Sequence, residues 1–302
     1  MKEAGADIAS VPLTGSTRYS AAGDFVALTK PRLNMLVVAT SAAGYYLGSA
    51  GSPDVVAMAQ AVAGTALVAG GAAVLNQVYE RDTDALMRRT RQRPLPDGRI
   101  ATGDASLFGL VLAGAGLAIL GARANVLSAI LALATLFTYL IVYTPMKRRS
   151  PASTLVGAIP GALPPLIGWT AANGSLSTGG LALFAIVFLW QVPHFMAIAW
   201  LYRADYAMAG FPMLPVIDPE GRRAARQAVI YGTLLVPASL VPALIGLSGT
   251  AYMVFAGASG IALVWLAIRF ASTRSDASAW ALFIGSITYL PLLWAAMIAD
   301  KL

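Results

Sequence analysis

Nine long apolar stretches run through the sequence, and they restrict the fold more than any other feature. A helix needs about 20 apolar residues to cross the roughly 30 Å hydrocarbon layer of a bilayer. The chain is 58% hydrophobic and 12% charged, whereas soluble domains carry about 25% charged residues. The sequence therefore predicts an all-α, polytopic membrane protein with nine transmembrane helices. Their predicted bounds are Leu33–Gly48, Val55–Tyr79, Ser106–Gly121, Val126–Tyr143, Thr154–Ala172, Gly180–Tyr202, Ala228–Leu247, Ala251–Phe270 and Ala279–Ala299.

The distribution of basic residues predicts the orientation of these helices. If the amino terminus is cytoplasmic and nine spans alternate, all 21 Lys and Arg residues except Arg123 and Lys301 lie on the cytoplasmic side. Cytoplasmic loops of membrane proteins carry such an excess. The net charge of +7 thus reflects topology, and we expect no nucleic-acid partner.

The residues before the first span differ from the rest of the chain. Residues 1–25 lack the basic-then-apolar order of a signal peptide, and we interpret them as a disordered cytoplasmic tail. Residues 26–302 are predicted to form a single transmembrane domain. Its long cytoplasmic loops, Arg81–Ala105 and Arg203–Gln227, are predicted to cap one face.

Charged residues gather where the second apolar stretch ends. Asn76, Glu80 and Asp84 are spaced four apart, so on a helix their side chains form one stripe. Carboxylates and a carboxamide are hard oxygen ligands of the kind that hold Mg²⁺ together with phosphates. Arg88 and Arg93 follow, and guanidinium groups suit phosphate oxygens. The alternative is a polar helix end that emerges into water.

Two later loops supply further candidates at the same predicted depth. Asp205, just past the sixth span, would add an oxygen ligand to the metal site, or it could pair with Arg203. Lys147 and Arg148 follow the fourth span and are candidates for gripping a diphosphate. They could equally be ordinary basic anchors, since every cytoplasmic loop is basic.

The only histidine, His194, lies inside the sixth predicted span, next to Pro193. An ionisable side chain at that depth is costly and is a functional candidate by default. Its imidazole could face a haem iron or move a proton. In the structural alternative, it bonds a carbonyl group that the Pro193 kink leaves unpaired.

Several motifs together resemble the intramembrane prenyltransferases of the UbiA superfamily, and within it the branch that farnesylates haem B. They are the four-spaced triplet, TKPR at residues 29–32, YTPMKRRS at 143–150, WQVPHF at 190–195 and YRADYAMAGFPMLP at 202–215. The resemblance covers most of the chain. Two positions depart from the superfamily pattern: Glu80 replaces an aspartate, and Ala209 stands where a second acid would follow Asp205.

The resemblance implies a UbiA-type bundle and a specific reaction. Farnesyl diphosphate would alkylate the 2-vinyl group of haem B, water would add, and haem O and diphosphate would result. Mg²⁺ is the implied cofactor, and haem B is a substrate. The implied metal ligands are Asn76, Glu80, Asp84 and Asp205, which with Lys147 and Arg148 form the catalytic set; the implied substrate-binding residues are Arg88, Arg93, Tyr143, His194 and Arg203.

The resemblance also implies a bacterial inner-membrane location, a role in cytochrome oxidase biogenesis and haem A synthase as a downstream partner. Two other functions stay open. A prenyltransferase acting on an aromatic acid or quinone precursor would need the same diphosphate site. A secondary transporter would place its charges near mid-bilayer, whereas here only His194 lies there.

Overall fold

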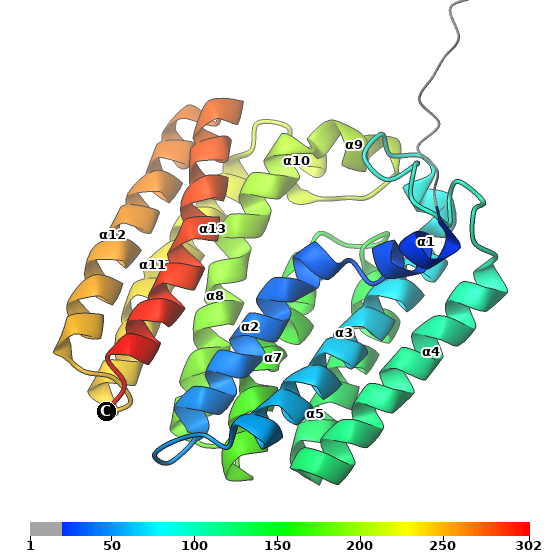
Figure 1. Cartoon of the computed structure of the whole chain (residues 1–302). Helices are drawn as coiled ribbons and strands as arrows, with labels where there is room; N and C mark the ends of the chain where they lie inside the picture. The colour runs from blue at the N-terminus through cyan, green and yellow to red at the C-terminus, as the bar shows by residue number, and fades with distance from the viewer. Residues whose placement is uncertain (1–19) are drawn as a thin grey trace, which may run out of the picture.

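The computed structural model describes residues 20–302, and these residues form helices with a single isolated β-bridge, between Ser248 and Lys301. Figure 1 shows the bundle. In order, the elements are α1 (Ala21–Leu28), α2 (Pro31–Gly48), α3 (Val55–Asp84), α4 (Thr102–Ile119), η1 (Leu120–Ala124), α5 (Val126–Phe137), η2 (Thr138–Tyr143), α6 (Thr144–Met146), α7 (Ser153–Asn173), α8 (Thr178–Leu201), α9 (Arg203–Met208), α10 (Leu214–Ile217), α11 (Arg222–Leu244), α12 (Thr250–Thr273) and α13 (Asp276–Ala299).

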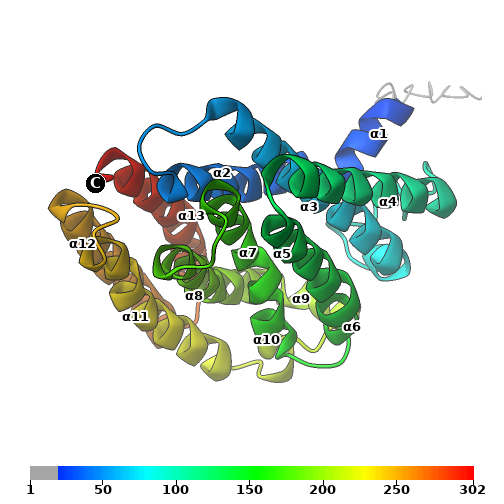
Figure 2. The same ribbon diagram turned by 90° about the horizontal axis from the view of Figure 1, so that it is seen from below.

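Within residues 20–302, 8 helical segments are long and apolar enough to cross a membrane, so the chain is a multi-pass membrane protein. They coincide with the second to ninth predicted spans. The first predicted span corresponds to α2, whose 18 residues give a helix about 27 Å long. Its first turn contains the polar residues Arg32 and Asn34. Helix α2 is not among the eight, but it packs within the bundle against α3 and α7 (Figure 2). The predicted all-α membrane bundle is confirmed.

The amino-terminal prediction needs a correction. Residues 1–19 lie outside the described residues, but Ala21–Leu28 form helix α1, so a disordered tail reaching residue 25 extends too far. The Ser20 hydroxyl accepts a hydrogen bond from the Gly23 amide at 3.1 Å and caps this helix. Asp24 pairs with Arg99 at 2.9 Å, which ties α1 to the loop after α3.

Glycines allow α2 and α7 to approach closely. A Cβ on Gly44 would lie 2.1 Å from the carbonyl oxygen of Pro165, and one on Gly168 would lie 1.9 Å from that of Ser41. Apolar burial drives helices together only weakly in lipid, so such backbone contact stabilises membrane bundles. These contacts fix α2 against α7, and both helices line the cavity described below.

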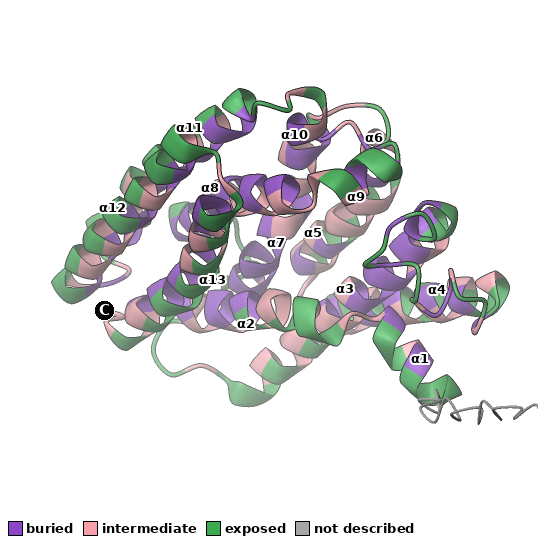
Figure 3. Ribbon diagram, turned by 90° about the horizontal axis from the view of Figure 1, so that it is seen from above, coloured by how far each residue is buried: buried purple, intermediate pink, exposed green. Residues whose placement is uncertain are grey.

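A cap of short helices and loops covers one end of the bundle (Figures 1 and 3). It contains α9, α10 and the loop between α3 and α4. Met87 from that loop packs with Tyr206, Phe211 and Met213 in one buried cluster. The cap therefore brings the segment after α3 against the segment after α8, although more than a hundred residues separate them in sequence.

Candidate active site

The predicted stripe on α3 is buried near the capped end of the bundle. Asn76, Glu80 and Asp84 expose only 2%, 6% and 1% of their surface. The neighbouring face of α3 packs against α4 through small residues, with a Cβ on Gly71 reaching 2.6 Å from the Gly109 carbonyl oxygen. The stripe therefore faces the interior and is not a helix end solvated by water.

Each member of the stripe has one partner from another segment. Lys147 pairs with Glu80 through Nζ and Oε1 at 2.7 Å, and Arg93 pairs with Asp84 through Nη1 and Oδ2 at 2.7 Å. The Asn76 amide donates to the Thr144 hydroxyl at 3.1 Å. Buried carboxylates are costly unless they are paired, so these contacts explain how two acids are accommodated on one buried face.

One oxygen of each side chain has no such partner. Among the described residues, no donor bonds to Asn76 Oδ1, Glu80 Oε2 or Asp84 Oδ1. In the same range, only the Ser153 hydroxyl and the Trp294 indole nitrogen are enclosed without a partner. The three oxygens therefore border accessible space, where a ligand can reach them.

The π-helix η2 and the turn after it supply the opposite side of the site. Tyr139 and Tyr143 stack with their ring centroids 5.4 Å apart, and the Lys147 ammonium lies 5.4 Å from the Tyr143 ring and 5.2 Å from that of Phe211. Burial opposes the charge of Lys147, but Tyr143 and Glu80 raise its pKa above the ordinary value. Lys147 is thus a fixed cation beside the stripe. Single-turn π-helices are frequent at functional sites.

Lys30 is a second cation at this end. It precedes Pro31 at the start of α2 and adopts the left-handed conformation, with φ of 50°. Burial, and next the charge of Arg93, lower the pKa of Lys30 to about 8. Lys30 also borders a second hollow of about 520 Å³ beside α1, which Arg89 and Arg93 help to line.

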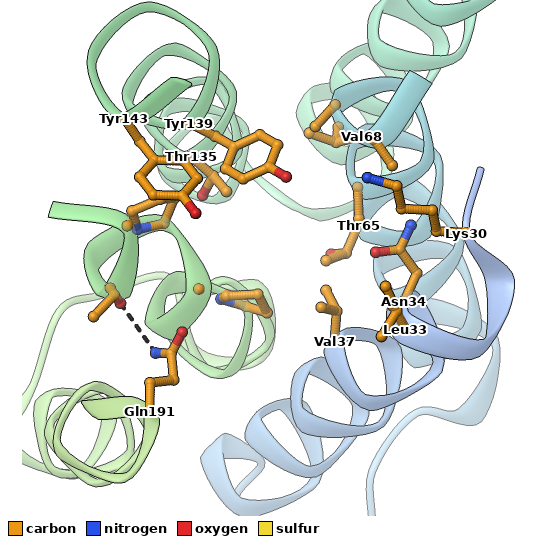
Figure 4. Close-up of a pocket in the computed structure, with 18 of the residues that line it drawn as sticks. Lys30, Leu33, Asn34, Val37, Thr65, Val68, Thr135, Tyr139, Tyr143 and Gln191 are labelled. Carbon is orange, nitrogen blue, oxygen red and sulfur yellow. Dashed lines mark hydrogen bonds between the residues drawn. The ribbon is translucent and has the colours of Figure 1, made fainter. Parts of the chain in front are cut away.

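A cavity of about 370 Å³ extends from Lys30 into the bundle between α2, α3, η2, α7 and α8 (Figure 4). Its walls are mainly apolar, as at Val37, Val68 and Ile167, and its polar groups include Tyr139 and Tyr143 near the charged end. Ligand pockets commonly enclose 300–1,000 Å³ and combine apolar walls with a few placed polar groups. The charged end adjoins this cavity, because Lys30 and Tyr143 line the cavity and Tyr143 also contacts Lys147.

The other predicted site residues are placed differently. Arg88 and Arg148 are exposed, and within residues 20–302 neither side chain makes a hydrogen bond or ion pair. Arg203 pairs with Asp276 of α13 at 2.9 Å and lies over the Trp200 ring, so it points away from the stripe. Arg203 does not pair with Asp205, because its guanidinium group is already paired with Asp276 at the start of α13. Asp205 is half-buried and has no side-chain partner in the described part of the chain.

The four predicted metal ligands do not form a preassembled cage. In the range 20–302, no group of three or more His, Cys, Asp or Glu side chains is placed to hold a metal ion. Glu80 and Asp84 point to cations instead. Mg²⁺ usually takes only one or two protein carboxylates and completes its shell with water and substrate phosphates. The oxygens of Asn76, Glu80 and Asp84 fit that kind of site.

His194 is held on the other side of α8 from the cavity wall. Its Nδ1 lies 2.9 Å from the Ser286 hydroxyl. The ring stacks between Trp190 and Phe283, with centroid distances of 4.8 and 5.2 Å. The next residue, Phe195, lines the cavity instead. His194 therefore does not bond a carbonyl group at the Pro193 kink in the described residues; its hydrogen bond with Ser286 joins α8 to α13.

Sequence reasoning passed over several residues that the structure adds. Tyr139, Asn34 and Gln191 line the cavity, and Thr144 fixes Asn76. The sequence offered two signals. Tyr139 precedes Tyr143 by one helical turn, and Gln191 is an isolated amide within an apolar stretch.

Comparisons with known proteins agree with this architecture. A family model described as the UbiA prenyltransferase family matches residues 37–295. A solved structure of digeranylgeranylglyceryl phosphate synthase aligns with a TM-score of 0.78 at 17% identity, over 92% of this chain and 97% of that one. A UbiA homolog from Archaeoglobus fulgidus, solved with GPP and Mg²⁺, aligns with a TM-score of 0.64 at 16% identity, over 91% and 99%. At these identities the likeness establishes the fold.

Curated relatives are more similar in sequence. The protoheme IX farnesyltransferase of Solibacter usitatus is 47% identical over 287 residues, which cover 92% of this chain and 98% of the relative. That of Opitutus terrae is 46% identical over 280 residues, with 92% and 95% coverage. The similarity therefore spans the stripe on α3, the Lys147 turn and α8 together.

Proposed function

The chain belongs to the UbiA prenyltransferase family, and from this premise we propose that it transfers a farnesyl group from farnesyl diphosphate to the 2-vinyl group of haem B. Water adds in the same reaction, and the products are haem O and diphosphate. Relatives that are nearly half identical over almost their full length carry the name protoheme IX farnesyltransferase, which supports this acceptor.

One observation carries the proposal: a buried cluster of acids and cations adjoins a mainly apolar cavity through Lys30 and Tyr143. Farnesyl diphosphate has the matching shape, a highly charged head on a long apolar tail. The head would contact Lys147 and Lys30, and the tail would extend past Tyr143 between α2 and α7. Because these groups are held in place before substrate arrives, they stabilise the charge that develops on the leaving group.

The residues of the stripe are suited to hold Mg²⁺ in the proposed complex. Within residues 20–302, Asn76, Glu80 and Asp84 each retain an oxygen without a hydrogen-bond donor, and the solved homolog with GPP and Mg²⁺ supports a divalent metal in this fold. Mg²⁺ would neutralise the departing diphosphate. Asp205 has no side-chain partner in the described range and would join the site through movement of the cap.

The protein's own groups perform the remaining tasks. Lys147 orients the diphosphate oxygens, and the faces of Tyr139 and Tyr143 stabilise positive charge on the allylic carbon as the bond breaks. The apolar walls exclude bulk water, so the reactive carbon meets the vinyl group first. His194 is proposed to bind haem B, with its ring held in place by the Ser286 hydroxyl.

We also propose that the amino terminus and the cap face the cytoplasm of a bacterial cell and that the bundle lies in the inner membrane. The strong bias of basic residues toward the capped end supports this orientation. Haem A synthase, which would consume the product, is the proposed downstream partner.

The direct test supplies purified protein with farnesyl diphosphate, haem B and Mg²⁺ and measures the product by mass spectrometry. We expect haem O, and we expect excess chelator to stop its formation reversibly. Transfer to an aromatic acid or quinone precursor with no haem product would contradict the proposed acceptor. Undiminished turnover in excess chelator would contradict the metal.

A further inference from the structure

The cavity contains an oriented amide oxygen that the proposed binding of farnesyl diphosphate does not use. The Gln191 side chain extends from α8 to the cavity wall, where its nitrogen donates to the carbonyl oxygen of Ala158 at 3.1 Å (Figure 4). The same nitrogen also donates to the carbonyl oxygen of Val187 at 3.1 Å. An amide nitrogen has two donors and no acceptor capacity, so contact with two carbonyl groups fixes which end is oxygen. Gln191 Oε1 is therefore turned away from both carbonyls.

Gly161 of α7 leaves space for this oxygen because glycine has no Cβ. A Cβ at position 161 would lie 2.0 Å from Gln191 Oε1, well inside van der Waals contact. Within residues 20–302 no group donates to Oε1, and it is not among the enclosed atoms without a partner. The oxygen therefore borders the cavity as an acceptor without a donor, which is costly in apolar surroundings unless a ligand supplies one.

The acceptor lies close to the charged end. Gly157, four residues before Gly161 on the same face of α7, lies against Tyr143, where a Cβ would come within 2.5 Å of the ring. One turn of helix separates the two glycines, about 6 Å. Gln191 Oε1 is thus roughly one turn deeper than the tyrosine that lies beside Lys147.

The chemistry of the proposed reaction identifies the donor. The farnesyl chain has no N–H or O–H group, and haem B has none on its vinyl-bearing face. Water is the one reactant that can donate to an amide oxygen in this cavity. We infer that Gln191 holds the water molecule that adds to the vinyl-derived cation, and this inference depends on the function proposed above.

The bond between C1 of the farnesyl group and oxygen breaks, and its electron pair leaves with diphosphate. The vinyl π pair forms the new bond from the terminal vinyl carbon to C1, which leaves a cation on the carbon attached to the porphyrin. The oxygen of the held water forms a bond to this carbon, and the proton released goes to the departing diphosphate. Gln191 accepts a hydrogen bond and orients the oxygen lone pair, so it is a positioning residue.

If the water is not held in place, the cation can follow a competing reaction. It loses a proton from the adjacent carbon and becomes an alkene, so the farnesylated haem is lighter by one water. The identity of the product thus reports on Gln191 separately from the overall rate. A defect that only weakened folding would lower total product without changing the ratio of the two forms.

The test compares Gln191→Leu and Gly161→Ala with the parent protein in ¹⁸O-labelled water. The first variant removes the acceptor, and the second displaces it while every polar group is kept. We expect both to raise the ratio of dehydrated to hydroxylated product by roughly tenfold, the effect of losing one hydrogen bond in the partitioning step. The parent should make only labelled, hydroxylated product.

Gln77→Leu is the matched control. Gln77 also donates to two backbone carbonyls, those of Leu28 and Ala73, but it does not line this cavity. We expect its product ratio to equal that of the parent. Asn34, which lines the cavity one turn from Lys30, offers the competing acceptor, and Asn34→Leu should also leave the ratio unchanged.

Three results would overturn the inference: an unchanged product ratio in folded Gln191→Leu, a changed ratio only in Asn34→Leu, or loss of both product forms in a Gly161→Ala protein whose melting temperature matches that of the parent. The last contradicts it because formation of the carbon–carbon bond needs no water. Absence of any farnesylated haem from the parent protein would instead refute the proposed function.

Discussion

The two halves of the bundle present charge to the capped end in different ways. In the half from α2 to α7, the acids of α3 are buried and paired with Lys147 and Arg93. In the half from α8 to α13, Asp205 is half-buried and its side chain has no partner among residues 20–302, while Arg203 pairs with Asp276. The first half holds a buried, paired ionic site, whereas the second half offers Asp205 on the short cap helix α9.

The charged groups of the α3 site are in place before substrate binds, whereas Asp205 on α9 would have to be brought to the site. Fixed, desolvated charges stabilise a transition state without reorganising during the reaction. A group on a cap segment contributes only after the cap has adjusted around the substrate. We therefore expect substitutions in the α3 site to impair turnover more than those on α9, and four predictions test that order.

The largest effect is expected from Asp84→Asn. It keeps the shape of the side chain but removes the charge that Arg93 and the metal would share, so we expect turnover to fall about 10³-fold. Asp82→Asn is the matched control, since Asp82 is an exposed acid of the same helix that pairs with Arg81. Equal activity in the two variants would remove Asp84 from the site.

Lys147→Met should lower turnover by about 10²-fold and also destabilise the protein, because it leaves Glu80 buried without its partner. Breaking a buried pair from one side costs about 3–5 kcal/mol. Adding Glu80→Gln should restore the melting temperature but not the activity. Recovery of activity in the double variant would show that the pair serves stability alone.

The pKa of Lys30, lowered by burial to about 8, predicts a pH dependence. Lys30 is protonated below that value and binds an anionic head group, and it becomes neutral as the pH rises through 8. We expect kcat/KM for farnesyl diphosphate to fall by up to about tenfold per pH unit above this value, since kcat/KM reports groups of the uncomplexed enzyme. Lys30→Arg should keep its charge and flatten this limb. Superimposable profiles for the two proteins would exclude Lys30 from binding.

The smallest effect is expected from Asp205→Asn, which should lower turnover about tenfold and raise the Mg²⁺ concentration needed for half-maximal rate. Arg203→Gln, which removes the contacts with Asp276 and Trp200 but leaves Asp205 in place, should leave that concentration unchanged. If Asp205→Asn is as damaging as Asp84→Asn, the two halves contribute equally and the comparison fails.

The sequence predicted the parts of this account that depend on local periodicity. Apolar stretches located the helices, and the four-residue spacing placed Asn76, Glu80 and Asp84 on one face because helical geometry is regular. Lys147 was also a candidate from its position after a span. These features need only one helix or one loop to be interpreted.

Features that depend on packing between distant elements could not be predicted in this way. The partner of Arg203 is Asp276 on α13. Asp84 pairs with Arg93 and not with Arg88 because of the path of the loop after α3, which has no periodicity in its sequence. The orientation of Gln191 depends on a glycine of α7. The helical start of α1 was also missed, because its cap and its contact with Arg99 involve a segment too short to show a pattern.

The most direct measurement is an experimental structure of the protein with Mg²⁺ and a non-cleavable thio analogue of farnesyl diphosphate. We expect the diphosphate between the α3 stripe and Lys147, with the isoprenoid tail in the cavity lined by Tyr143 and Val68. A diphosphate bound instead against Arg203 and the α8–α13 half, with the α3 ion pairs unchanged, would contradict this expectation.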